Sequence, residues 1–168
     1  MNYKIVACDL DGTLLNNQSG VDRENLDAIG ELSGKGVLFV PSSGRTFSEI
    51  PAPVKNHPDI RYFSLSNGAV VYDRLTGQRM ATGISRETGR KILDALYACE
   101  THVTMRHGGE CYVDAAFQSA YFHKYYNLMQ AHCGVVRDYA IHRGDFRKFC
   151  YEADGAEVFS AFFHDCEE

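Results

Sequence analysis

A short apolar run, a helix and a second apolar run follow one another at the start of this 168-residue chain. Lys4 to Cys8 is rich in apolar and β-branched residues, which is typical of a strand buried on both faces of a parallel sheet. Asp22 is placed to cap a helix that the glycines of "SGKG" end, and Val37 to Val40 follows as a second buried strand. Two strands joined through a helix by short loops form a right-handed crossover with parallel strands. The pattern therefore predicts an α/β fold.

A second unit of the same kind follows. "RTFSEI", residues 45–50, predicts a helix that Pro51 and Pro53 interrupt, and "RYFSLS", residues 61–66, predicts a third strand. The carboxyl ends of all three strands are expected at one edge of the sheet, where open α/β sheets bind their ligands.

The pattern changes after Asn67, and we expect residues 1–74 to form an α/β core and residues 75–168 a small inserted α+β module. The elements predicted there are a hairpin about residues 76–77, a helix from Ser85, two antiparallel strands about residues 108–109, a helix over 117–130, a strand over 147–153 and a helix beginning at 154.

Composition excludes several classes of function. The net charge of −5, without a long run of one sign, does not fit a nucleic-acid-binding protein. No apolar stretch has membrane-spanning length and none resembles a secretion signal, so we expect a cytoplasmic protein with no membrane partner. The six cysteines form no C-x-x-C pair, which favours reduced thiols over a structural zinc site.

Two aspartates in "DLDGTLL" follow the first strand directly. Alternate residues of an extended segment face the same way, so Asp9 and Asp11 can converge on one point, and a magnesium ion is the natural counterion for two such carboxylates. A calcium loop of the EF-hand type is excluded, because Gly12 is the fourth residue from Asp9 where that loop needs glycine sixth. An Asp-Gly hairpin turn and an exposed acidic turn remain alternatives at this point.

Polar groups also follow the other two strands. In "VPSSGRT", Ser42, Ser43 and Gly44 can offer hydroxyl and backbone N–H groups to an anion at the start of a helix. Arg45 can add charge or pair with a helix carboxylate. In "SNGA", Asn67 brings an amide that can touch a substrate. Together these groups favour a phosphate site at the predicted sheet edge.

These motifs resemble those of the haloacid dehalogenase-like phosphatases of the Cof-type branch. "DLDGTLL" matches the first motif of that superfamily, "SSGRT" is similar to the second, and "SNGA" is typical of the branch. The resemblance implies a partial Rossmann-like parallel sheet with an inserted α+β cap. It also implies a magnesium-dependent phosphatase that acts on small phosphorylated metabolites of the sugar-phosphate type.

Site roles carry over from the resemblance residue by residue. It implies that Asp9 is the nucleophile that forms an aspartyl-phosphate, and that Asp11 is the general acid and base. Asp9 and the backbone carbonyl of Asp11 would hold Mg²⁺. Ser43, Gly44 and Arg45 would bind the phosphoryl group, and Asn67 would line the substrate side.

The resemblance also predicts what this chain lacks. Family members return from the cap to the core with a lysine and a G-D-x-x-N-D segment, and neither is visible here. We therefore expect a chain truncated relative to its relatives, either the front part of a longer protein or a homodimer that covers its incomplete sheet. Two alternatives stay open: a phosphate-binding protein without catalysis, and a phosphotransferase or phosphomutase of the same superfamily.

Overall fold

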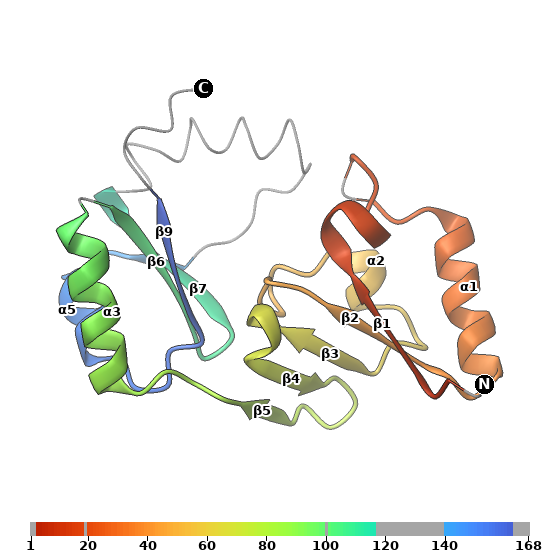
Figure 1. The fold of residues 1–168 in the computed structure, drawn as a ribbon. Helices are drawn as coiled ribbons and strands as arrows, with labels where there is room; N and C mark the ends of the chain where they lie inside the picture. Colours follow the sequence, from red (N-terminus) through yellow and green to blue (C-terminus); the bar gives the residue numbers. More distant parts are fainter. Residues whose placement is uncertain (1–2, 19, 100, 117–139, 163–168) are drawn as a thin grey trace. The chain divides into compact units, whose positions relative to one another are not determined.

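The computed structural model describes residues 3–18, 20–99, 101–116 and 140–162 of the chain (Figure 1). These residues form two compact units, one made of the described residues up to Ala81 and one of those from Thr82 onward. Each unit combines helices with a sheet, and the predicted α/β class is confirmed. In the described part of the chain, no helix is both long enough and apolar enough to cross a membrane.

A five-stranded sheet organises the first unit, and its strands lie in the order in which they occur along the chain. The first three strands are parallel, as predicted, and the last two continue the sheet in antiparallel fashion. The strands are β1 (Ile5–Asp9), β2 (Leu38–Ser42), β3 (Tyr62–Leu65), β4 (Val70–Asp73) and β5 (Arg79–Ala81). The hairpin expected about residues 76–77 is the β4–β5 hairpin, which extends this sheet beyond the domain boundary expected after residue 74.

Two helices cover one face of this sheet, α1 (Arg23–Gly34) and α2 (Ala52–Lys55). Ile29 of α1 and Val54 of α2 belong to the same buried cluster as Phe63 of β3. The helix predicted after Asp22 is confirmed, although the Asp22 carboxylate accepts a hydrogen bond from Asn16 Nδ2 at 2.8 Å and makes no capping bond to the helix. The other cluster members are Leu10, Leu14, Leu15, Phe39, Ile50, Ile60, Leu65 and Val70.

The second unit is a four-stranded sheet with two helices, in the strand order β8-β7-β6-β9. Leu93 of α3 and Phe146 of α5 share a buried cluster with Met105 of β6. The helix predicted from Ser85 and the strand pair about residues 108–109 are both confirmed. The elements are α3 (Arg86–Ala98), β6 (His102–His107), β7 (Glu110–Asp114), β8 (Ala140–His142), α5 (Phe146–Glu152) and β9 (Val158–Phe162).

The helix predicted over residues 45–50 is wrong. Thr46 donates hydrogen bonds to Glu49 Oε2 from its backbone N–H at 2.7 Å and from its hydroxyl at 2.9 Å, which closes a turn in place of a helix. The helix α2 begins only after Pro51, and it contains Pro53 in its first turn, where the fixed φ of proline suits a helix.

Two predictions near the end of the chain are wrong: an expected strand is a helix, and an expected helix is a strand. Residues 147–153, predicted as a strand, lie mostly in α5, where the Asp145 carboxylate caps the helix by accepting the Lys148 N–H at 2.9 Å. The helix predicted from residue 154 is the strand β9, because the two carboxylates of the supposed capping box bind elsewhere. Asp154 accepts the Arg86 N–H at 2.9 Å, and Glu157 accepts the Gly109 N–H at 3.0 Å. The helix predicted over residues 117–130 lies outside the described residues.

Candidate active site

Parallel pairing brings three polar strand ends together in the first unit. Asp9 at the end of β1 is in register with Ser42 at the end of β2, and Ser42 is in register with Ser64 near the end of β3. The residues that follow these strands therefore emerge at one edge of the sheet, as the sequence predicts.

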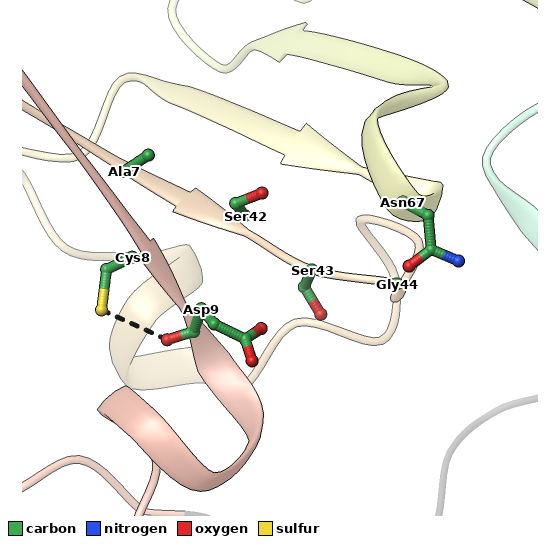
Figure 2. A pocket seen from close by; sticks show the side chains of 7 residues that line it. All are labelled: Ala7, Cys8, Asp9, Ser42, Ser43, Gly44 and Asn67. Carbon is green, nitrogen blue, oxygen red and sulfur yellow. Dashed lines mark hydrogen bonds between the residues drawn. The ribbon is translucent and has the colours of Figure 1, made fainter.

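An open pocket with a volume of about 450 Å³ lies at this edge (Figure 2). Four of the six predicted site residues line it, namely Asp9, Ser43, Gly44 and Asn67. The remaining lining residues are Ala7, Cys8 and Ser42. Sequence reasoning did not assign Ala7 and Cys8 to the site, although the strand pattern that places Asp9 there also signals its two neighbours.

Asp9 is exposed at the carboxyl end of β1, where it lines the pocket. Its Oδ1 accepts a hydrogen bond from the Leu10 N–H at 2.8 Å, which fixes the direction of the carboxylate. The neighbouring Cys8 thiol donates to the Asp9 backbone carbonyl at 3.2 Å, and burial, helped by the charge of Asp9, raises the pKa of that thiol. Cys8 thus remains a neutral thiol beside the carboxylate.

Backbone hydrogen bonds join the loop after β2 to the turn after β3. The Asn67 N–H donates to the Ser43 carbonyl at 3.1 Å, and the Ser66 N–H donates to the Arg45 carbonyl at 3.0 Å. Ser43 is buried, and its hydroxyl oxygen accepts the Arg45 N–H at 3.2 Å. The two loops therefore form one rigid rim of the pocket.

The turn after β3 has an uncommon backbone. Ser66 and Asn67 have φ angles of 51° and 56°, a left-handed conformation that residues other than glycine seldom adopt. Such a conformation persists where the surrounding structure holds it, as the bond from Ser66 to Arg45 does here. It directs the Asn67 side chain toward Gly44, where Figure 2 shows the amide at the pocket wall.

Asp11 and Arg45 lie outside the set of residues that line the pocket, and they bind each other. Arg45 Nη2 lies 2.5 Å from Asp11 Oδ1, and Arg45 Nε lies 3.0 Å from Asp11 Oδ2. Arg45 therefore pairs with a carboxylate, as one of its two expected roles requires, but this carboxylate lies in the turn after β1 and not in the helix expected over residues 45–50. Sequence reasoning missed the further partner of Arg45, the backbone carbonyl of Glu49, which accepts Nη1 at 3.0 Å.

Among the residues that the structure describes, no group of three or more His, Cys, Asp or Glu side chains is arranged to hold a metal ion. Magnesium is usually bound by only one or two carboxylates together with waters and substrate phosphate. The exposed Asp9 carboxylate suits that mode of binding, whereas the Asp11 carboxylate is occupied by Arg45.

The sequence matches a known protein family and several curated proteins. The model of the haloacid dehalogenase-like hydrolase family matches residues 6–158. The phosphatase YwtE of Bacillus subtilis, which is named for 5-amino-6-(5-phospho-D-ribitylamino)uracil, is 36% identical over 95 residues that cover 55% of this chain and 32% of YwtE. Phosphatase YwpJ of the same organism is 34% identical over 70 residues, 42% of this chain and 25% of YwpJ. The chain thus spans a third or less of these curated relatives.

Solved structures share the fold. A haloacid dehalogenase-like hydrolase from B. subtilis superimposes with a TM-score of 0.68 at 22% identity, covering 90% of this chain and 57% of that one. The subclass IIB sugar phosphatase BT4131 superimposes with a TM-score of 0.68 at 13% identity, covering 90% of this chain and 55% of that one. The match of the family model over most of the sequence shows that the chain belongs to the haloacid dehalogenase-like hydrolase family.

Proposed function

We propose that the protein is a magnesium-dependent phosphatase that acts on small phosphorylated metabolites of the sugar-phosphate type through an aspartyl-phosphate on Asp9. The observation that carries this proposal is the pocket at the strand ends, which combines an exposed carboxylate with hydroxyl, peptide and amide groups. Family membership supports hydrolysis, and the names of two relatives support phosphate esters as substrates. Because the chain spans a third or less of those relatives, the activity of the whole protein is part of the proposal.

Asp9 would supply the attacking oxygen. The Leu10 N–H engages Oδ1, so Oδ2 is the oxygen available to phosphorus. As the bond from Oδ2 to phosphorus forms, the bond from phosphorus to the leaving oxygen breaks, and that oxygen takes a proton from Asp11. Water then attacks phosphorus, the Asp9 carboxylate leaves with the electron pair of its bond, and Asp11 takes the proton of the water.

Ser43 and Gly44 would hold the phosphoryl oxygens during both steps. The Ser43 hydroxyl oxygen already accepts the Arg45 N–H, which leaves its hydrogen to donate to a phosphoryl oxygen. The backbone N–H of Gly44 adds a second donor on the same rim, and donors fixed in this way stabilise the charge that develops in the transition state. Asn67 also lines the pocket, with its amide next to Gly44, and would contact the rest of the substrate.

Magnesium fits the residues present, with Asp9 as its carboxylate ligand and the backbone carbonyl of Asp11 as a second ligand. When bound, the ion would offset the negative charge of the phosphate that Asp9 approaches.

A phosphate-binding protein without catalysis is the alternative that one observation favours. Asp11 does not line the pocket, and its carboxylate is engaged by Arg45. Such a protein would bind inorganic phosphate but would not turn over a phosphate ester.

Magnesium-dependent hydrolysis of an aryl phosphate by the wild type and by Asp9→Asn tests the proposal. We expect Asp9→Asn to lower kcat by about 10³-fold or more, because it removes the nucleophile. Asp27→Asn, which changes an exposed aspartate on α1 paired with Arg23, is the matched control and should keep wild-type activity. Equal rates for the wild type and Asp9→Asn, or no effect of chelation, would refute the proposal, and phosphate binding without turnover would support the alternative. Addition of alcohol acceptors to the same assay detects a phosphotransferase, which would release alcohol phosphates faster than inorganic phosphate.

A further inference from the structure

The guanidinium of Arg45 forms hydrogen bonds with Asp11 and Glu49, and neither residue lines the pocket. Nε and Nη2 bind the two carboxylate oxygens of Asp11, and Nη1 binds the Glu49 carbonyl at 3.0 Å. All three nitrogens of the planar group therefore donate to groups of the protein itself. A side chain held in this way is poorly placed to bind a phosphoryl group as well.

Arg45 is the more buried member of the Arg45–Asp11 pair. Its side chain is 12% exposed, whereas that of Asp11 is 45% exposed. The turn that carries Glu49 is itself fixed, because the buried Thr46 donates two hydrogen bonds to Glu49 Oε2. On the other side, Asp11 lies in a short turn next to Gly12, whose φ is 76°. Arg45 is thus the fixed member of the pair and Asp11 the movable one.

We infer that Arg45 is a positioning residue for Asp11 and not a ligand of the phosphoryl group, an inference that rests on the proposed phosphatase function. The two-pronged contact sets the orientation of the Asp11 carboxylate, which otherwise would rotate freely at the surface. Orientation of a group that transfers a proton is worth a large factor in rate, because a displacement of about 1 Å can cost about 10²-fold.

Kinetics of the 168-residue chain with Arg45→Gln tests the inference. We expect kcat for an aryl phosphate to fall by about 10²-fold, while KM and the inhibition constant of inorganic phosphate stay within about twofold. In an Asp11→Asn background the same substitution should cost nothing further, because the group that it positions is gone. A tenfold rise of KM and of the phosphate inhibition constant, or a full loss in the Asp11→Asn background, would overturn the inference.

Arg61→Gln is the matched control. Arg61 makes a comparable two-pronged contact to Asp73 in the same unit, with nitrogen to oxygen distances between 2.6 and 3.2 Å, and neither residue lines the pocket. This variant loses an arginine and an ion pair but should retain kcat. A loss equal to that of Arg45→Gln would mean that Arg45 acts only through stability, which would also overturn the inference.

A readout that does not need turnover separates this inference from the proposed function. The ¹⁵N spectrum of the arginine Nε–H groups contains one resonance that Arg45→Gln removes. We expect Asp11→Asn to shift that resonance, and inorganic phosphate with Mg²⁺ to leave it in place. If phosphate shifts it and Asp11→Asn does not, Arg45 is a phosphate ligand and the inference fails. Absence of turnover with an intact Arg45–Asp11 resonance would instead mean that the proposed phosphatase function fails.

Discussion

Gly44 and Asn67 are in such close contact that any side chain at position 44 would collide with the Asn67 amide. A Cβ atom at this position would lie 2.8 Å from Asn67 Oδ1, which is closer than such contacts normally occur. The atom in the way is the end of a side chain, so it can rotate without moving the backbone.

Gly44→Ala should therefore alter the pocket more than the stability of the fold. We expect the Asn67 amide to rotate away, KM for a phosphorylated substrate to rise by about tenfold, and the free energy of unfolding to change by less than about 1 kcal/mol. Steady-state kinetics and urea unfolding measure the two effects. Gly34→Ala, at a helical position where an added Cβ meets nothing within 4 Å, is the control and should leave KM unchanged. An unchanged KM in Gly44→Ala would contradict a substrate contact of Asn67.

Gly83→Ala should destabilise the second unit. The added Cβ would lie 2.5 Å from three backbone atoms of Gly155, which cannot move aside because Gly155 donates its N–H to the Ile84 carbonyl at 3.0 Å. We expect a loss of about 1–3 kcal/mol in the free energy of unfolding, measured in urea. Gly89→Ala in α3 makes the opposite control, since its Cβ would meet the Phe159 ring at an ordinary 3.4 Å and helix propensity favours alanine. Equal stability of both variants would show that the contact between residues 83 and 155 is not tight.

Alkaline pH should weaken the second unit through Cys150. Burial, with a smaller contribution from the charge of Asp114, raises the pKa of the Cys150 thiol to about 12 from an ordinary value of 9.0. The unfolded chain ionises this thiol above about pH 9 while the folded chain does not, so the stabilisation is complete below that pH and is lost as the pH rises toward 12. Urea unfolding of the wild type and Cys150→Ala at pH 7 and at about pH 10.5 measures it. The wild type should lose its advantage at the higher pH, and a constant difference would contradict the prediction.

The face of the first sheet opposite α1 and α2 is apolar and exposed. Ile5, Leu38 and Met80 on this face are 58%, 43% and 67% exposed. The prediction that a second copy covers the sheet leads us to expect a dimer at micromolar concentration in light scattering. Leu38→Lys should make it monomeric, whereas Leu75→Lys, in the β4–β5 turn, should not. A wild-type chain that is monomeric and unfolds cooperatively would refute the dimer.

Much of the first unit could be predicted because its signals are local. The strand β1 and the helix α1 have the apolar pattern and the flanking residues of such elements, and the polar groups of Asp9, Ser43 and Asn67 follow strand ends directly. The prediction that β1 is buried on both faces is wrong: its residues are exposed or half-buried, because it is the edge strand of a sheet that α1 and α2 cover on one face. Parallel pairing then brings these groups together without any further information. Most of the polar residues that line the pocket could thus be predicted from the sequence, whereas the volume of the pocket could not.

Two of the failures share a physical cause, which is that side chains with a local signature have distant partners. Asp154 and Glu157 read as a capping box, yet their carboxylates bind the backbone of Arg86 and Gly109, far away in the sequence. The Arg45–Asp11 pair could not be predicted for the same reason, because its members are 34 residues apart in the sequence. In α5, apolar residues at positions 146 and 150 have helical spacing, which the prediction of a strand overlooked.

The two strand orders imply different routes of assembly during synthesis. Each strand of the first sheet pairs with its predecessor, so this sheet can grow one strand at a time as the chain leaves the ribosome. In the second sheet β6 lies between β7 and β9, and β9 is the last of these strands to be made. Until β9 arrives, β6 has an open edge, and closing a contact between strands so far apart in sequence slows folding. A nascent chain halted before residue 158 would therefore have all five described strands of the first sheet paired, whereas β6 of the second sheet would lack its partner β9.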